Sequence, residues 1–501
     1  MALTRRQFLK RSATIAAGAT VAPAMKWLPG TGVSYAAGPS DAIVVFVQLY
    51  GGNDGLNTVY PLTGTQRATY EEFRPTLQLP NTVGGLSGWA AEGFDTGNGV
   101  LSVGTDGAGN EYALHPAMKA MHDLYLDGDL AVIPGVHYPY ADYSHFRSEV
   151  IYYTGDPNGA GGFGWMGKYL DLAGFSATEV PAVMLDNNYN PLFTPTGTSL
   201  FAFNRLSDLR FPAASRTVQR SDAFSQMYAE SALSDSGLFP ELVLMGNTGV
   251  AAVSKFEEYY RSTCELSGQV EGLLVDSEGC YAPSNSLVYS SPLNVETNPR
   301  LQNNGLADDL RHVAAVIRSN VGARFFHVGI GGFDSHSNQE QGYYHSYLLN
   351  RVSEAIGGFW GEMKQSGITL PGGYSGYDTG DLSPRVIIVT LSEFGRTSKQ
   401  NAASAAAAGT DHGRAAPQFV IGSTVQAGMH GTYPMLNDPD LDNDLRMAFD
   451  FRDLYGTILE RWLNVPAADI GPGLGKLFAA TPNPDWLGQS YTSYTPIPFL
   501  P

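Results

Sequence analysis

Continuous apolar runs of strand length recur along the chain and are separated by polar segments. Such runs are typical of strands that are buried on both faces of a sheet. They occur at Ala42–Leu49, Leu130–Val136, Pro181–Leu185, Arg324–Ile330, Arg385–Leu391 and Gln418–Ile421. We therefore expect these segments to form the strands of one central sheet.

Helical periodicity fills much of the chain between these runs. Apolar residues recur there at every third or fourth position, which places them on one face of a helix. The pattern predicts helices at His115–Leu126, His145–Tyr153, Leu306–Ser319, Tyr343–Lys364 and Phe451–Leu463. Strands that alternate with helices predict an α/β fold, with a largely parallel central sheet sandwiched by helices.

The alternation stops between about residue 188 and residue 298. This range is rich in Ser, Asn and Pro, and it contains both cysteines, Cys264 and Cys280. We interpret it as an insertion or cap within a single domain that covers residues 37–501. In an oxidising compartment these two cysteines are expected to form a disulfide. Zinc binding by the pair is the weaker alternative, because neither cysteine belongs to a C-x-x-C motif.

Polar residues follow several of the predicted strands directly. The carboxyl ends of parallel strands meet at one edge of a sheet, and ligands usually bind there. Asp54 follows the first run, Asp334 and His336 follow the fourth, and Glu393 follows the fifth. Two later segments add Asp411 with His412, and His430. This mixture of carboxylates and imidazoles suits one or two divalent metals, zinc or manganese before calcium or magnesium. The alternative is that these residues cap helices and form turns.

A second group of candidate residues begins the helix after the second run. Ser144 lies at the predicted helix N-terminus, where backbone N–H groups favour an anion, and His145 and Arg147 follow it. Ser144 is either the helix cap or a nucleophile, activated by metals that lower the pKa of its hydroxyl or of a bound water. Arg147 and Arg396 either bind the anion through paired hydrogen bonds or form ordinary salt bridges.

The N-terminus resembles a bacterial export signal. Thr4–Lys10 contains the pair Arg5–Arg6, and the weakly apolar run Ala13–Ala24 follows it. That run is too short and too rich in Ala, Gly and Thr to span a bilayer. Small residues at Ser34 and Ala36 predict cleavage after Ala36, so we interpret residues 1–36 as a twin-arginine signal peptide.

This signal predicts handling by the twin-arginine translocase and a periplasmic or extracellular location. No later stretch is apolar and long enough to cross a membrane, so we expect no membrane anchor after cleavage. The formal net charge is −18, and cleavage removes only basic residues. The mature chain is therefore more acidic still, which argues against nucleic acid as a partner.

Several segments together resemble the family known as domain of unknown function 1501, secreted bacterial proteins that usually carry twin-arginine signals. The resemblance covers nearly all of the mature chain. It rests on Gln48–Asn57, His115–Met118, Tyr143–Ser148, Phe333–His336, Ser392–Thr397, Gly409–Gly413 and Asp450–Tyr455. That family is similar to the alkaline-phosphatase-like superfamily. The resemblance therefore implies an alkaline-phosphatase-like fold, with two metals at the sheet edge that act on phosphate or sulfate esters.

The resemblance also implies roles for single residues. In the superfamily pattern, Asp54 is similar to the first metal carboxylate and Ser144 to the nucleophile, while Asp334 and His336 resemble its paired ligands. The late Asp–His pair and the final histidine of the superfamily resemble Asp411, His412 and His430.

Two departures from the superfamily pattern leave alternatives open. Glu393–Phe394 stands directly after the fifth strand, where the superfamily has its Asp–His pair, so either Glu393 or Asp411–His412 fills that role. The spacing Asp334-x-His336 is also tighter than the usual gap. One of the two metals is then either absent or bound differently.

Two functions of different classes fit these features. The first is an exported metal-dependent hydrolase of a small phosphate or sulfate ester, in which metals stabilise the oxyanion and Ser144 or a metal-bound water attacks. The second is a secreted binding or scaffold protein that retains the fold without turnover. Other enzyme classes lack their motifs. Gly162–Lys168 resembles a P-loop, but Tyr169 follows it where Ser or Thr is required. The G-x-S-x-G nucleophile elbow and the C/S-x-P-x-R motif of formylglycine sulfatases do not occur.

Overall fold

The computed structural model describes the greater part of the chain that follows the predicted signal. The described residues are 41–96, 99–158, 162–175, 181–185, 191–194, 200–202, 300, 303–368, 378–473 and 476–501. The predicted signal peptide, both cysteines and most of the range 188–298 lie outside these residues. The signal, the disulfide and the cap therefore stay predictions.

A central sheet of nine strands passes through the described part of the molecule. Its order is β13-β5-β12-β9-β1-β8-β6-β7, and β14 pairs with β5. The strands are β1 (Ile43–Leu49), β5 (Leu130–His137), β6 (Ala182–Leu185), β7 (Leu200–Ala202), β8 (Phe325–Ile330), β9 (Val386–Leu391), β12 (Ala416–Ile421), β13 (Gly428–Met429) and β14 (Phe449–Asp450). Only β12 is antiparallel to its neighbours, β5 and β9, within these residues. The predicted α/β fold with a largely parallel central sheet is confirmed.

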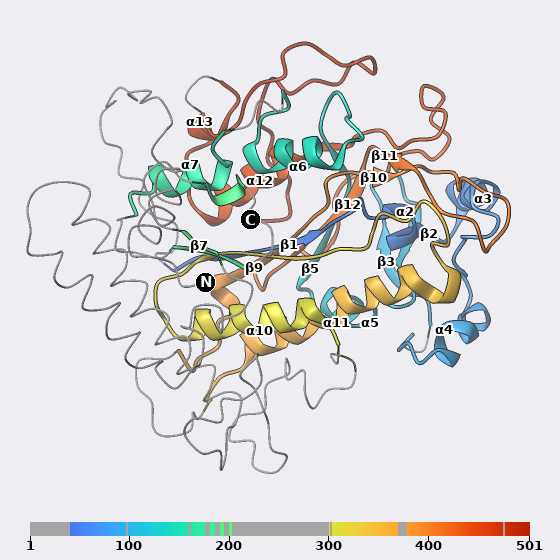
Figure 1. Cartoon of the computed structure of the whole chain (residues 1–501), viewed down its shortest axis with the longest axis horizontal. Coiled ribbons are helices and arrows are strands. Elements are labelled where there is room, and N and C mark those ends of the chain that lie inside the picture. The colour runs from blue at the N-terminus through green and yellow to red at the C-terminus, as the bar shows by residue number, and fades with distance from the viewer. Residues whose placement is uncertain are drawn as a thin grey trace, which may run out of the picture.

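Helices cover both faces of this sheet (Figure 1). One face carries α5 (Lys119–Leu126), α10 (Gly305–Arg318) and α11 (Tyr344–Lys364). The other carries α6 (His145–Thr154), α7 (Trp165–Leu172), α12 (Phe451–Thr457), the π-helix Ile458–Trp462 that continues it, and α13 (Ala467–Ile470). A helix with enough consecutive apolar residues to span a bilayer does not occur among the described residues.

Alternate residues of β1 enter two separate cores. Val45 and Val47 pack with residues of α10 and α11, whereas Val44 and Phe46 pack with residues of α6 and α12. Every residue of β1 is buried as a result. This burial explains why the central strands are continuous apolar runs instead of alternating sequences.

A smaller sheet and several short elements lie beside the central sheet. The smaller sheet contains β2 (Val59–Pro61), β3 (Leu101–Thr105) and β4 (Glu111–Leu114), all antiparallel. The short elements are α2 (Gly55–Thr58), α3 (Gly64–Phe73), α4 (Ser87–Ala91), β10 (Gly395–Arg396) and β11 (His412–Gly413), and the last two pair as a ribbon. The sequence pattern predicted none of these elements.

Candidate metal centre

The candidate site lies where three neighbouring parallel strands end. β9, β1 and β8 are adjacent in the sheet, and Leu49 at the end of β1 lies beside Ile330 at the end of β8. The loops that follow these strands therefore meet at one edge. Gly51 allows their close approach, because its φ is +114° and a Cβ there would lie 2.4 Å from the backbone nitrogen of Asp334.

The reversed direction of β12 brings a further loop to the same edge. An antiparallel strand starts where its parallel neighbours end, so Asp411 and His412, which precede β12, join the site. The residues after β12 leave at the opposite edge. His430 lies there, with its backbone N–H donating to Val132 near the start of β5 and its Nε2 2.7 Å from the carbonyl oxygen of Gln426. The structure does not bring His430 together with the other candidate ligands.

Helix α6 contributes residues from its first turn. Ser144 is the N-cap by position, but its side chain is exposed and makes no capping hydrogen bond. The loop before it is held by Asp142, whose Oδ1 accepts from the backbone N–H of Ser144 at 2.8 Å. The hydroxyl of Tyr138 donates to the carbonyl oxygen of Asp142 at 2.9 Å. Asp142 therefore orders this turn, and the hydroxyl of Ser144 is not needed for capping.

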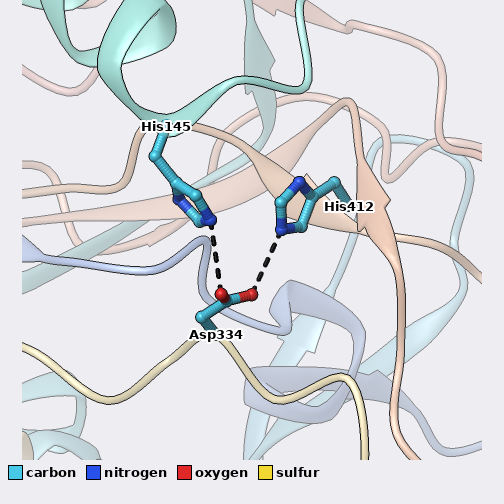
Figure 2. A group of neighbouring side chains, drawn as sticks. All are labelled: His145, Asp334 and His412. Carbon is cyan, nitrogen blue, oxygen red and sulfur yellow. Dashed lines mark hydrogen bonds and ion pairs between the residues drawn. The ribbon is translucent and has the colours of Figure 1, made fainter.

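Asp334 is the centre of the candidate site. Its Oδ1 is 3.1 Å from Nε2 of His412, and its Oδ2 is 3.5 Å from Nε2 of His145 (Figure 2). One ligand atom from each of these three residues lies within 4.8 Å of the other two. The ligand atoms of a tetrahedral zinc ion lie roughly 3.3 Å apart when each is about 2.0 Å from the metal. The spacing therefore suits one divalent metal.

A third imidazole borders the same carboxylate. Nε2 of His336 is 3.1 Å from Oδ1 of Asp334 and 3.0 Å from Nε2 of His412. Its other nitrogen, Nδ1, is 3.0 Å from Oδ1 of Asp411. Three imidazoles from α6, the loop after β8 and β11 thus converge on one aspartate.

The other two imidazoles are also held through Nδ1. Nδ1 of His145 is 2.8 Å from Oε1 of Glu393, and Nδ1 of His412 is 2.8 Å from the carbonyl oxygen of Tyr143. Carboxylate and carbonyl oxygens only accept, so we assign the proton of each neutral ring to Nδ1. Each Nε2 then carries a lone pair toward Asp334. Metal-binding histidines are usually oriented in this way.

Asp334 itself is charged at neutral pH. Burial raises the pKa of its carboxyl, but the Arg396 guanidinium, which donates to it at 2.6 Å, and the neighbouring imidazoles of His412 and His145 together outweigh this effect, and the pKa falls to about 2. Burial lowers the pKa of His412 below its usual value, which favours the neutral imidazole. The contact between Nε2 of His412 and Asp334 therefore joins two acceptors, and a cation between them would satisfy both.

The two arginines for which anion contacts and salt bridges were both open have protein partners. Arg396 is buried and donates to backbone carbonyl oxygens of the three loops around the site as well as to Asp334. Arg147 lies on the exposed side of α6 and pairs with Asp142 at 3.1 Å. Both arginines thus form the salt bridges that were one of the two alternatives. Arg396 is instead a positioning residue for Asp334.

Asp54 was expected to be a metal ligand, but it belongs to a buried ion pair. Its Oδ2 is 2.5 Å from Nη1 of Arg74, and both side chains are fully buried. Gln339 also donates to this carboxylate, and the backbone N–H of Asn57 approaches its Oδ1 at 3.4 Å. Burial raises the pKa of Asp54, but the charge and hydrogen bond of Arg74, together with the hydrogen bond from Gln339, outweigh it, and the pKa is lowered. Both oxygens of Asp54 thus have protein partners.

Glu393 and Asp411 hold imidazoles through Nδ1 and do not belong to the group of His145, Asp334 and His412. Oε1 of Glu393 accepts from the backbone N–H of Gly51 at 2.7 Å and from His145. The hydrogen bond to Glu393 raises the pKa of His145, against the effect of burial. Of the two alternatives for the late ligand role, His412 is the residue that reaches Asp334. The sequence pattern did not indicate the carbonyl oxygen of Tyr143 as a partner of His412.

Part of this chain matches a known family. Residues 304–485 match the family model described as "Protein of unknown function (DUF1501)". The matched range contains Asp334, His336, Glu393 and His412, whereas α6 with His145 precedes it. The finding supports this domain family for that part of the chain. A search of curated proteins gave no match.

Proposed function

We propose that this protein is a metal-dependent hydrolase of a phosphate or sulfate ester. The observation that carries the proposal is the convergence of three imidazole Nε2 atoms on Asp334, each ring being held at Nδ1 by an acceptor. Turns and helix caps do not require three imidazoles in this orientation. Oriented imidazoles around a carboxylate are typical of transition-metal sites.

Zinc or manganese fits this set of donors best. Imidazole suits zinc, whereas calcium and magnesium prefer oxygen ligands. Asp334, His145 and His412 would hold the ion, and His336 borders them. Among the described residues this is the single such group of donors, so we propose one metal here in place of two. A bound divalent metal supplies positive charge that stabilises the oxyanion of the ester.

Ser144 is the proposed nucleophile, with water as the alternative. Its hydroxyl is exposed, and the residue directly precedes the candidate ligand His145. It also stands at the N-terminus of α6, where backbone N–H groups favour an anion. The ester oxyanion and the attacking oxygen would then be close to each other.

We also propose an alkaline-phosphatase-like fold for the whole domain. Two features support it, the largely parallel sheet and a group of candidate ligands at the carboxyl ends of its central strands. The twin-arginine pattern at Arg5–Arg6 supports export of the folded protein to the periplasm or beyond. Replacing both arginines by lysine should keep the protein in the cytoplasm, and unchanged export in a fractionation assay would refute this part of the proposal.

A non-catalytic binding protein remains the second candidate function. The observation that favours it is the engagement of Arg147 and Arg396 with protein acceptors, which leaves neither guanidinium to bind a substrate anion. A fold alone does not establish turnover.

One experiment distinguishes the two functions. The full chain is expressed with its signal, purified without chelators and analysed for metal content. Hydrolysis of phosphate monoesters, phosphate diesters and sulfate esters is then measured for the wild type, His412→Ala and Ser144→Ala. A matched control is His122→Ala, which replaces a histidine on α5, in the helix layer of one sheet face.

The hydrolase proposal predicts bound metal and turnover in the wild type and in His122→Ala. His412→Ala should lose both properties, and Ser144→Ala should lose turnover while it keeps the metal if Ser144 is the nucleophile. Bound metal without turnover of any ester by the wild type would favour the binding protein. Absence of metal from the wild type would refute the metal centre itself.

A further inference from the structure

Four large aromatic side chains are exposed on the loop before α6, on α6 itself and on the C-terminal segment. The exposed fractions are 84% for Phe146, 68% for Trp486, 47% for Tyr140 and 45% for Tyr143. We call these residues the aromatic rim. A single exposed apolar residue is ordinary, but a group of large ones is typical of a binding surface.

Hydrogen bonds connect the loops that carry the aromatic rim. The hydroxyl of Tyr140 donates to the carbonyl oxygens of Asn483 and Pro484 at 2.9 and 2.7 Å, which joins its loop to the loop of Trp486. The ring of Trp486 lies 6.0 Å from the guanidinium carbon of Arg414. The rim therefore belongs to one ordered surface although its residues are far apart in sequence.

Asp444 connects this surface to Tyr143. Its Oδ2 accepts from the hydroxyl of Tyr143 at 2.8 Å, and its Oδ1 accepts from the backbone N–H of Arg414 at 2.5 Å. Arg414 in turn pairs with Asp485 at 2.8 Å. These bonds connect the segments of Tyr143 and Trp486 to Arg414, which lies two residues after the candidate ligand His412.

The aromatic rim also adjoins the candidate ligands directly. Phe146 follows His145 in the first turn of α6, and the carbonyl oxygen of Tyr143 accepts from Nδ1 of His412. The segment Tyr143–Phe146 therefore carries two of the exposed rings as well as the candidate ligand His145, and its backbone contacts His412.

The charges of this surface indicate what kind of group fits. Arg147 is paired with Asp142, and Arg414 is buried and paired with Asp485. The charge of each of these two arginines is thus offset by a carboxylate, and the chain as a whole has a net charge of −18. A neutral group suits the rim better than a second phosphate or sulfate, and a flat ring makes the largest contact with aromatic faces.

We propose that the aromatic rim binds an uncharged, ring-bearing alcohol part of the substrate ester, a sugar or an aryl group. This inference rests on the proposed hydrolase function and specifies its substrate class. Phe146 and Trp486 are its main contact residues, because their rings are the most exposed. They act as specificity residues and not as catalytic residues.

The test compares esters that carry the same anion. The value of kcat/KM is measured for phenyl phosphate, glucose 6-phosphate and ethyl phosphate, together with the three corresponding sulfate esters. The readout is the ratio of kcat/KM for a ring ester to that for the ethyl ester, which cancels general effects on the metal centre. Phe146→Ala and Trp486→Ala should each lower this ratio about tenfold, given the usual strength of ring contacts.

Two further variants serve as controls. Phe146→Tyr keeps a ring and should keep the ratio, and Leu126→Ala removes a side chain that is also exposed, at the C-terminal end of α5. A decrease for phenyl but not glucose esters identifies an aryl group as the ligand, and the reverse identifies a sugar. An unchanged ratio in both alanine variants would overturn the inference.

Binding is measured separately by calorimetry with the same esters. If the wild type hydrolyses none of them, the proposed hydrolase function fails. The inference about the rim is then decided by the affinities. Ring esters that bind more tightly than ethyl esters, with a preference lost in Phe146→Ala, would support it, whereas equal affinity or no binding would refute it.

Discussion

Residues that hold the Nδ1 atoms of the imidazoles are expected to affect metal affinity at the candidate centre, and Glu393 is the clearest case. Its buried carboxylate holds Nδ1 of His145 at 2.8 Å. Glu393→Gln keeps the shape and one acceptor oxygen but removes the charge. We expect metal affinity to fall about 10- to 100-fold, as is usual when such a partner is lost.

This affinity is measured by competition with a chromogenic chelator. Glu71→Gln is a matched control, because it removes a carboxylate of α3 that is half exposed and pairs with Arg67. Wild-type affinity in Glu393→Gln would show that Glu393 does not orient a metal ligand.

The buried pair of Asp54 and Arg74 leads to a prediction about stability. Arg74→Met leaves Asp54 buried without its cation, which should cost about 3–5 kcal/mol in the free energy of unfolding. Urea denaturation measures the loss. The double variant with Asp54→Asn should recover part of it, because no unpaired charge then remains. Arg461→Met, at the more exposed pair of Arg461 with Glu460, should cost less than about 1 kcal/mol.

At the residue scale, candidate metal ligands were easier to predict from the sequence than the hydrogen-bond and ion-pair partners of these side chains. Asp334 and His412 could be selected because acids and histidines near strand ends are unusual. Nothing in the local pattern indicated that Arg74 would form an ion pair with Asp54, or that Arg396 would donate hydrogen bonds to backbone carbonyl oxygens. Such pairings depend on tertiary contacts between distant segments, which periodicity does not encode.

At the scale of elements, burial decided which strands could be predicted. The central strands are buried on both faces and produce continuous apolar runs, so their positions agree with β1, β5, β6, β8, β9 and β12. The strands β2 to β4 are three to five residues long and produce no such run. The apolar pattern also could not predict the direction of β12, because an apolar run has the same composition whichever way the strand runs. That direction is why His412 joins the site and His430 does not.

Helix α12 leads to a prediction about pH. Burial raises the pKa of Asp453, in its first turn, from 3.8 to about 7, against the hydrogen bond from the backbone N–H of Thr495. The unfolded chain therefore loses this proton at lower pH than the folded protein does. The contribution of Asp453 to stability is full below about pH 4 and is lost as the pH rises to about 7.

Asp453→Asn removes this titration and can keep the bond from Thr495 through its amide oxygen. The variant should gain stability relative to the wild type between about pH 4 and pH 7, and the gain should level off above that range. Denaturant unfolding at a series of pH values measures the difference. A difference that does not change with pH would show that the folded carboxyl titrates normally.

At the scale of the whole molecule, the candidate centre connects segments that are far apart in the chain. His145 belongs to α6, Asp334 follows β8, and His412 lies in the ribbon before β12. A metal held by all three binds the folded chain and not the unfolded one. At a free metal concentration of about 1,000 times Kd, this linkage stabilises the fold by about 4 kcal/mol.

Removal of the metal should therefore lower the Tm of the full chain. For a protein of this size we expect a decrease of roughly 4–8 °C, measured by thermal unfolding before and after dialysis against a chelator. Re-addition of zinc should restore the Tm of the wild type. His412→Ala should start near the lower Tm and respond little to zinc, because one of the three connections is absent. His122→Ala should respond as the wild type does. If the chelator removes the metal but leaves the Tm unchanged, the ion is not held between these three segments. The imidazoles that converge on Asp334 would then be a hydrogen-bonded network of protonated histidines.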